Sequence, residues 1–266
     1  SVSRAEIAAL LTRVVEPETR LTLTWTVAPY HSVKNATLAS LVKAPASTSL
    51  PTSARDTAAI DGLVRNMLAR GEHTITLNYS KALTTATASA LTQAFTSCVK
   101  TYCEQMYNAV SCRSYSTGKV VLTFSSTACA DETLETYRAK TLAAAIKIHD
   151  SLWESGTLSY DMNQYEIART YFQWLCDHCR YDNSAAEDSA SHLAYGALVS
   201  GLAVCDGYTG AYNLLLKLEG IECTSLFNDS HIWTLATLDG TQYHIDVTWG
   251  DQYGRTDLRY FGMSEE

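Results

Sequence analysis

Several features that would assign a protein to a particular class are missing from this sequence. Its formal net charge is −8 and it has no run of basic residues, so it gives no reason to expect binding to nucleic acid or to an anionic membrane surface. No apolar stretch reaches the roughly 18 residues that a transmembrane helix needs. The first residues, Ser1 to Glu6, are not a signal peptide, and this abrupt start suggests a processed product or a cloned fragment.

What the sequence does contain is enough apolar material for a folded core. Its 266 residues are 46% hydrophobic and 18% charged, which suits one large domain or two small ones. Residues 16–59 are rich in Thr, Ala, Ser and Pro and predict a linker or extended arm, with strand-like alternation from Leu21 to Val27. After this arm, the sequence predicts two separate folded units, over residues 60–158 and 159–266.

The unit over residues 60–158 is predicted to be a small α+β domain. The hydrophobic pattern predicts a helix, a strand, a helix, a hairpin and a helix over residues 52–69, 73–79, 84–104, 107–125 and 132–153. No motif in this unit carries chemistry. We therefore expect it to pack beside the second unit, as one wall of a cleft or as a platform for a substrate.

Eight cysteines are a high number for an intracellular enzyme. Four of them lie between residues 98 and 129, which permits one or two local disulfides whose pairing the sequence leaves open. Cys176 and Cys179 have the spacing of a redox or zinc motif, but they end a helical run, and no second such pair exists to complete a zinc site. We therefore expect these two to be packing thiols or a disulfide, and we expect no bound metal.

Cys205 lies where a reactive thiol is expected. A thiol attacks as the thiolate, and a helix N-terminus or a neighbouring imidazolium favours that charged form. Apolar residues recur at helical spacing after Cys205 until Gly220, which places the sulfur at the start of a helix of roughly four turns. Gly207 and Gly210 predict a slim first stretch that a substrate backbone can approach. Considered alone, a free cysteine is more often inert packing.

A predicted hairpin further along the chain carries a histidine and a carboxylate. The pattern predicts three strands, over residues 221–227, 232–238 and 243–248. Asp239 and Gly240 form a typical two-residue turn between the last two strands. His231 opens one arm and Asp246 lies within the other, so antiparallel pairing brings them close, and the carboxylate can hold the imidazole in place. With Cys205, they form a predicted set of nucleophile, base and orienting acid.

Neighbouring residues offer alternatives. His244 shares a strand face with Asp246 and is a rival base, although a partly exposed strand histidine is more often structural. Trp233 lies on the same strand face as His231, the predicted base. We expect it either to form a wall of the cleft or to fill the core. We expect Trp249 to fill the core and Asp251 to be a loop or capping residue.

Three ordered strings resemble the motifs of the transglutaminase-like superfamily, which belongs to the papain-like cysteine-enzyme fold. The strings are Val204-Cys205-Asp206-Gly207-Tyr208, His231-Ile232-Trp233 and Asp246-Val247-Thr248-Trp249. The resemblance covers about residues 160–263, with Ile232 and Thr234 in place of the common alanine and asparagine. It implies an α+β fold with a papain/transglutaminase-like core, in which a helix bearing Cys205 packs on an antiparallel sheet bearing His231 and Asp246. By resemblance, these three are the nucleophile, the base and the orienter.

An oxyanion hole needs hydrogen-bond donors, of which the backbone N–H of Cys205 is a natural one. No glutamine closely precedes Cys205, so the second donor is sought among Ser191, His192, Tyr195 and Ser200. The resemblance favours an aromatic residue in this segment, which selects Tyr195. Tyr208 and Trp233 complete the set of predicted pocket residues.

The N-terminal residues carry a separate resemblance. The segment from Ser3 to Arg13 is similar to the closing segment of an S-layer homology repeat, a module that anchors bacterial surface proteins to the cell wall. The alternative is an ordinary amphipathic helix over the same residues. The first interpretation assigns residues 1–15 to the end of such a repeat and implies a bacterial, secreted, wall-associated protein.

Three functions are compatible with these predictions. The first is thiol-dependent acyl transfer or hydrolysis on peptide or protein amide bonds, cell-wall peptide included, by a cysteine peptidase or transglutaminase-like acyltransferase without a cofactor. For a bacterial surface protein, hydrolysis is favoured slightly over cross-linking. The second is a catalytically silent peptide- or wall-binding module with the same fold. The third is a metal or redox protein that uses Cys176 and Cys179.

Overall fold

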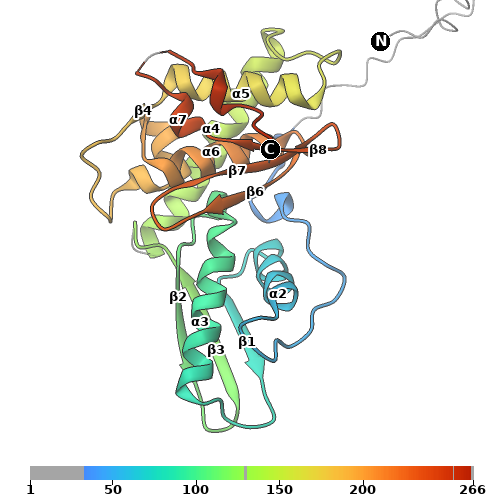
Figure 1. Cartoon of the computed structure of the whole chain (residues 1–266), viewed down its shortest axis with the longest axis vertical. Helices are drawn as coiled ribbons and strands as arrows, with labels where there is room; N and C mark the ends of the chain where they lie inside the picture. The colour runs from blue at the N-terminus through green and yellow to red at the C-terminus, as the bar shows by residue number, and fades with distance from the viewer. Residues whose placement is uncertain (1–32, 129–130, 254, 265–266) are drawn as a thin grey trace, which may run out of the picture.

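The chain folds into two parts that lie one above the other in Figure 1. The structure, a computed structural model, describes residues 33–128, 131–253 and 255–264. The predicted repeat end at residues 1–15 and the predicted strand from Leu21 to Val27 lie outside the described residues. The arm that begins the described part of the chain contains one short 3-10 helix, η2 (Ala39–Leu41).

A three-stranded antiparallel sheet and two helices make up the first part. The strand order is β1-β3-β2, with bounds Thr74–Asn78 for β1, Ala109–Ser114 for β2 and Lys119–Ser125 for β3. The helices α2 (Thr57–Ala69) and α3 (Thr85–Lys100) pack against each other and against this sheet. The central strand β3 alternates buried and more exposed side chains, so that Val120, Leu122 and Phe124 supply its apolar face.

The long helix α4 (Asp131–Glu154) belongs by its contacts to the second part. It packs against α6 (Cys205–Leu218), and the indole N–H of Trp153 donates a hydrogen bond to the carboxylate of Glu219 at 2.9 Å. The predicted border between the two units lies after residue 158. In the structure, α4 lies before this border but packs on the second part.

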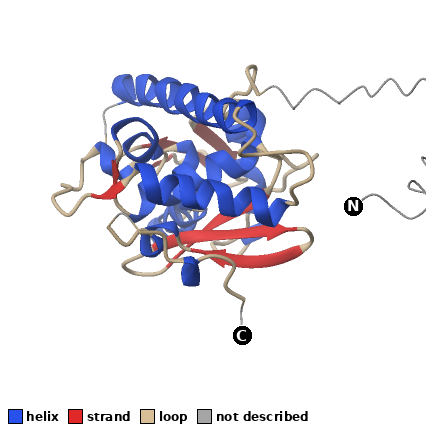
Figure 2. Cartoon of the chain, turned by 90° about the horizontal axis from the view of Figure 1, so that it is seen from above, coloured by secondary structure: helices blue, strands red, loops and turns tan. Residues whose placement is uncertain are grey.

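The helix α6 is the central element of the second part. Most of its residues are buried, and the buried polar side chains Thr209 and Asn213 form hydrogen bonds with neighbouring strand residues. Its fully buried residues include Tyr208, Ala211, Tyr212, Leu214, Leu215 and Leu216. Packed around it are α5 (Gln164–His178) and the antiparallel sheet of β6 (Glu222–Phe227), β7 (Ile232–Leu238) and β8 (Thr241–Ile245). Figure 2 shows this sheet along one side of the helices.

Two short helical turns precede α6. The chain makes a 3-10 helix, Ala190–His192, and then one turn of π-helix, Gly196–Ser200. The chain has to reverse here to enter β5 (Leu202–Ala203), which pairs in parallel with β4 (Arg180–Tyr181). Gly201, with a left-handed φ of 69°, makes this reversal possible.

The last predicted strand is shorter than expected, because β8 ends at Ile245. The side chain of Asp246 accepts the backbone N–H of Trp249 at 3.0 Å and so caps the short helix α7 (Val247–Gly250). The prediction that Asp246 lies inside the strand is therefore wrong, because it follows the strand and begins a helix. The prediction of an α+β architecture is confirmed. Among the described residues, no helix is both long and apolar enough to cross a membrane.

Candidate active site

Cys205 is the first residue of α6, as predicted. The preceding residue, Val204, is extended, and its N–H donates to the carbonyl oxygen of Ser191 at 3.0 Å, which fixes the entry of the chain into the helix. The sulfur therefore lies at the positive end of a helix of 14 residues, where a thiolate is favoured. Cys205 also lines a cavity of about 380 Å³.

Gly207 and Gly210 do not make room for a substrate backbone, which was their predicted role. A Cβ on Gly207 would lie 2.3 Å from the carbonyl oxygen of Ser191, and a Cβ on Gly210 would lie 3.3 Å from that of Cys103. The space beside this helical turn is therefore occupied by the protein's own backbone. The prediction that the glycines leave room for a substrate is wrong, and their small size instead lets two loops pack against α6.

The β7–β8 hairpin brings His231 and Asp246 together. Asp239 (φ 50°) and Gly240 (φ 84°) form the predicted turn, with Leu238 paired to Thr241. His231 lies immediately before β7 and Asp246 immediately after β8. The ring Nε2 of His231 lies 2.6 Å from Oδ2 of Asp246, while the other carboxylate oxygen accepts the N–H of Trp249.

Cys205 and His231 both line the cavity, and the interaction between their side chains raises the pKa of His231. Burial of the ring lowers the pKa of His231, but the hydrogen bonds and negative charges of Asp246 and Cys205 outweigh that effect and raise this pKa to about 9. Because Nε2 faces Asp246, the Nδ1 atom is the one that can face the thiol. The imidazole is therefore held in its charged form at neutral pH, in the position where it can stabilise a thiolate.

Two tryptophans stack on the ring of His231. The ring of Trp249 lies 4.9 Å from it, centroid to centroid, at 11° between the planes, and that of Trp233 lies 6.0 Å away at 18°. The indole of Trp249 is 53% exposed, so the prediction that it fills the core is wrong. The indole N–H of Trp233 donates to Nδ1 of His244 at 2.9 Å, which gives His244 a structural role in holding Trp233.

Tyr195 and Tyr208 are not among the residues that line the cavity. The ring of Tyr195 packs edge-on against Tyr137, with centroids 4.4 Å apart. Tyr208 is fully buried, and its hydroxyl donates to the carboxylate of Asp251 at 2.5 Å. These contacts give both tyrosines a packing role and give no support to their predicted place in the pocket.

The wall of the cavity opposite α6 comes from the first part of the chain. Lys100 at the end of α3, the residues Tyr107 and Asn108 before β2, and Thr127 after β3 all line it. The small α+β unit thus forms one wall of the cleft, as the sequence led us to expect.

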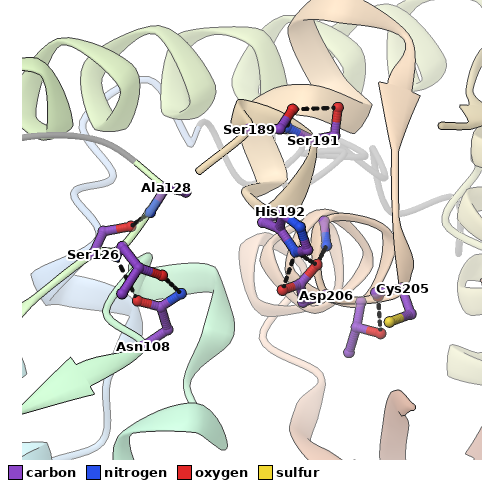
Figure 3. Close-up of polar contacts among 11 residues, drawn as sticks. Asn108, Ser126, Ala128, Ser189, Ser191, His192, Cys205 and Asp206 are labelled. Carbon is purple, nitrogen blue, oxygen red and sulfur yellow. Dashed lines mark hydrogen bonds and ion pairs between the residues drawn. The ribbon is translucent and has the colours of Figure 1, made fainter. Parts of the chain in front are cut away.

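A second histidine–carboxylate pair in this cavity was not anticipated. His192 and Asp206 both line it, and Nδ1 of His192 lies 2.9 Å from Oδ2 of Asp206 (Figure 3). The sequence offered His192 only as one of several possible oxyanion donors. No spacing rule links it to Asp206, because the contact joins a loop to a helix 14 residues further on.

The remaining cysteines among the described residues are free thiols, and two of them form the predicted packing pair. Cys176 and Cys179 are buried, and burial raises the pKa of Cys176 to about 12 and that of Cys179 to about 11. At neutral pH both thiols are protonated and poor nucleophiles. Three of the four cysteines in the predicted disulfide cluster, Cys98, Cys103 and Cys112, are unpaired, and Cys129 lies outside the described residues.

Comparison with known proteins relates this geometry to a family. The model of the transglutaminase-like superfamily matches residues 153–245, so the chain carries a transglutaminase-like domain there. The match includes Cys205 and His231 and ends one residue before Asp246. A solved structure described as the crystal structure of a TGase is 14% identical and covers 69% of this chain and 52% of that chain, with a TM-score of 0.33.

Two curated proteins show distant sequence similarity. Kyphoscoliosis peptidase of Homo sapiens is 27% identical over 103 residues, which are 32% of this chain and 16% of that protein. The Mus musculus protein of the same name is 26% identical over 103 residues, with the same shares. The chain therefore spans only a small part of the length of these relatives.

Proposed function

We propose that this protein is a thiol-dependent acyltransferase or hydrolase that acts on amide bonds of peptides or proteins. The observation that carries the proposal is that Cys205 and His231 line the same cavity while Asp246 lies 2.6 Å from the ring of His231. A nucleophile at a helix N-terminus, a charged imidazole and a buried carboxylate are the three groups that covalent catalysis by a thiol requires.

The first half of the reaction forms a thioester. The Cys205 thiolate attacks the amide carbon, and the carbonyl electrons move onto the oxygen, where the backbone N–H of Cys205 is a donor. As the intermediate collapses, the C–N bond breaks and the His231 imidazolium gives its proton to the departing amine. The acyl group is then bonded to sulfur, and His231 is neutral.

The second half of the reaction returns the enzyme to its starting state. Neutral His231 takes a proton from water or from an amine as that group attacks the thioester, and the C–S bond breaks. Water gives hydrolysis, and an amine gives a new amide bond. We favour hydrolysis, in keeping with the peptidase name of the distant relatives, and a cell-wall peptide is one candidate substrate. A secreted, wall-associated location is likewise a proposal, which depends only on the N-terminal resemblance.

Matched cysteine variants test the proposal. Wild-type protein, Cys205→Ser and Cys112→Ser are incubated with a peptide mixture and, separately, with a glutamine-containing protein and a labelled primary amine. Cys112 is a suitable control because it is a free, partly exposed thiol on β2 of the first part. Only Cys205→Ser should lose peptide cleavage or amine incorporation. Full turnover by Cys205→Ser would overturn the proposal, and tight peptide binding without any turnover by wild type would favour a silent binding module.

A further inference from the structure

The second histidine–carboxylate pair lies directly beside the nucleophile. Asp206 follows Cys205 in the first turn of α6, and both of its carboxylate oxygens lie near Nδ1 of His192, at 2.9 and 3.1 Å. The side chains of His192 and Asp206 are 27% and 30% exposed, so they face the cavity without being fully solvated. Figure 3 shows the pair next to Cys205.

Local hydrogen bonds hold both members of the pair in place. His192 ends the 3-10 turn Ala190–His192, which the hydroxyl of Ser189 caps by accepting the N–H of Ser191. The hydroxyl of Ser191 donates to Asp182 at 2.6 Å. On the helix, Oδ1 of Asp206 accepts the N–H of Gly207 at 3.0 Å. The carboxylate is therefore kept close to the start of the helix, where the thiol also lies.

A carboxylate in this place works against the chemistry of Cys205. A negative charge near a thiol disfavours the thiolate, and it offsets the favourable field of the helix N-terminus. An imidazolium paired with the carboxylate cancels most of that charge. The hydrogen bond to Asp206 raises the pKa of His192 above its ordinary value, against the opposing effect of burial, with smaller contributions from the Ala186 carbonyl and the charge of Glu187.

The other charges around His192 are consistent with a protonated ring. Asp206 faces it from α6, and Asp182 and Glu187 lie in the loop that precedes its 3-10 turn. His231, which is itself held charged, also lines the cavity, together with Lys100 and Asp229, which are exposed to solvent. Acidic groups therefore outnumber basic ones around the ring.

We propose that His192 is a positioning residue that neutralises the Asp206 carboxylate beside the nucleophile, so that the Cys205 thiolate forms without an uncompensated negative neighbour. The proposal depends on the proposed function only in taking Cys205 as the nucleophile. His192 itself is badly placed to act as a second base. One of its nitrogens faces Asp206, and the carbonyl of Ala186 contributes to the raised pKa of the ring.

The test follows the pH dependence of iodoacetamide alkylation at Cys205, read by peptide mass spectrometry, and it needs no substrate. Four proteins are compared: wild type, His192→Gln, Asp206→Asn and the double variant. His192→Gln leaves the carboxylate unpaired, so its alkylation midpoint should rise by roughly half to one pH unit. Asp206→Asn should leave the midpoint unchanged or lower it. The double variant should return close to wild type, because both charges are gone.

Two further measurements separate a charge effect from a structural one. His192→Lys restores a cation without the imidazole shape, so it should bring the midpoint back toward wild type. Raising the salt concentration should shrink the shift of His192→Gln, because the pair is partly exposed and its field is screened. Near-ultraviolet circular dichroism identifies any variant that does not fold.

The signs of the shifts decide the outcome. Equal midpoints in folded wild type and His192→Gln, or a rise in both single variants that adds in the double variant, would overturn the proposal in favour of a packing role. A failure of the proposed function has a different signature. In that case wild-type Cys205 alkylates only near the pH of an ordinary free thiol, and His231→Ala leaves its profile unchanged.

Discussion

The indole of Trp249 lies flat on the imidazole of His231, with 4.9 Å between the ring centroids, while its backbone N–H donates to Asp246. One residue thus contacts both the proposed base and the carboxylate proposed to orient it. The face of the indole covers the ring of His231, and the N–H binds the Asp246 carboxylate. Because Trp249 is more than half exposed, we expect its contribution to folding to be small.

We expect Trp249→Ala to lower kcat/KM by roughly 10- to 100-fold, less than the loss of a complete acid–base group. The variant should keep near wild-type stability in a denaturant titration, since most of the lost surface is already solvated. Trp249→Phe retains a ring over His231 and serves as the control, with a smaller loss of activity. An unchanged kcat/KM for Trp249→Ala would show that the stacking has no part in the reaction.

The pH dependence follows from the raised pKa of His231. Its pKa is about 9 in the folded chain against an ordinary value of 6.5. Proton binding at His231 therefore stabilises the folded state. This stabilisation is complete below about pH 6.5 and is lost as the pH rises through about 9. The charged thiolate–imidazolium pair is lost over the same upper range, so activity should fall above about pH 9.

Asp246→Asn tests the cause of this upper limit. Removing the carboxylate removes both the hydrogen bond and the charge that raise the pKa of His231, so the alkaline limb of the kcat/KM profile should move to lower pH. Asp257→Asn is the control, because it removes a carboxylate that binds Arg259. It should leave the alkaline limb of the kcat/KM profile in place. An alkaline limb that stays near pH 9 in Asp246→Asn would contradict this assignment.

A buried ion pair joins the two parts of the chain at the end of α6 far from Cys205. The ammonium of Lys217 on α6 contacts the fully buried carboxylate of Glu104, which follows α3. Lys217→Met leaves that carboxylate without its counter-charge and should destabilise the fold by about 3–5 kcal/mol. Replacing both residues, as in Glu104→Gln with Lys217→Met, should recover much of the loss. Equal destabilisation by single and double variants in urea unfolding would count against this coupling.

The two glycines in the first turns of α6 give a matched steric test. Gly207→Ala forces a Cβ to 2.3 Å from the Ser191 carbonyl oxygen, which is backbone and cannot move aside without shifting the loop that carries His192. We expect a loss of about 1–3 kcal/mol in stability and a marked loss of activity. Gly210→Ala meets Cys103 at 3.3 Å, and the better helix propensity of alanine offsets part of this tight contact, so its effect should be small. A fully stable, fully active Gly207→Ala protein would exclude the tight packing described here.

Local sequence was sufficient where local interactions decide the structure. The hairpin turn at Asp239 and Gly240 requires two residues with positive φ, and an Asp-Gly pair in the sequence predicts such a turn. The start of α6 at Cys205 and its end near Gly220 likewise follow from periodicity and a helix-ending glycine. The order of the cysteine, histidine and aspartate motifs then indicated three residues, of which Cys205 and His231 line one cavity and Asp246 contacts the ring of His231.

Other features depended on contacts between distant segments, and the sequence could not predict them. The size of Trp249 predicts a core residue. In the structure its backbone N–H binds Asp246, and its indole is exposed and stacks on His231. Gly207 reads as an opening for a substrate, yet the Ser191 carbonyl occupies that space.

The sequence by itself determined the helix that carries Cys205 and the turn of the hairpin, because each depends on residues close together in the chain. It also indicated the candidate triad, through the order of three motifs that resemble those of a known superfamily. Only the tertiary structure decided that His192 and Asp206 form a second pair beside the thiol, and that Trp249 covers the base. Such contacts depend on how a loop, a helix and a hairpin pack against one another, and packing has no period or motif that a single sequence displays.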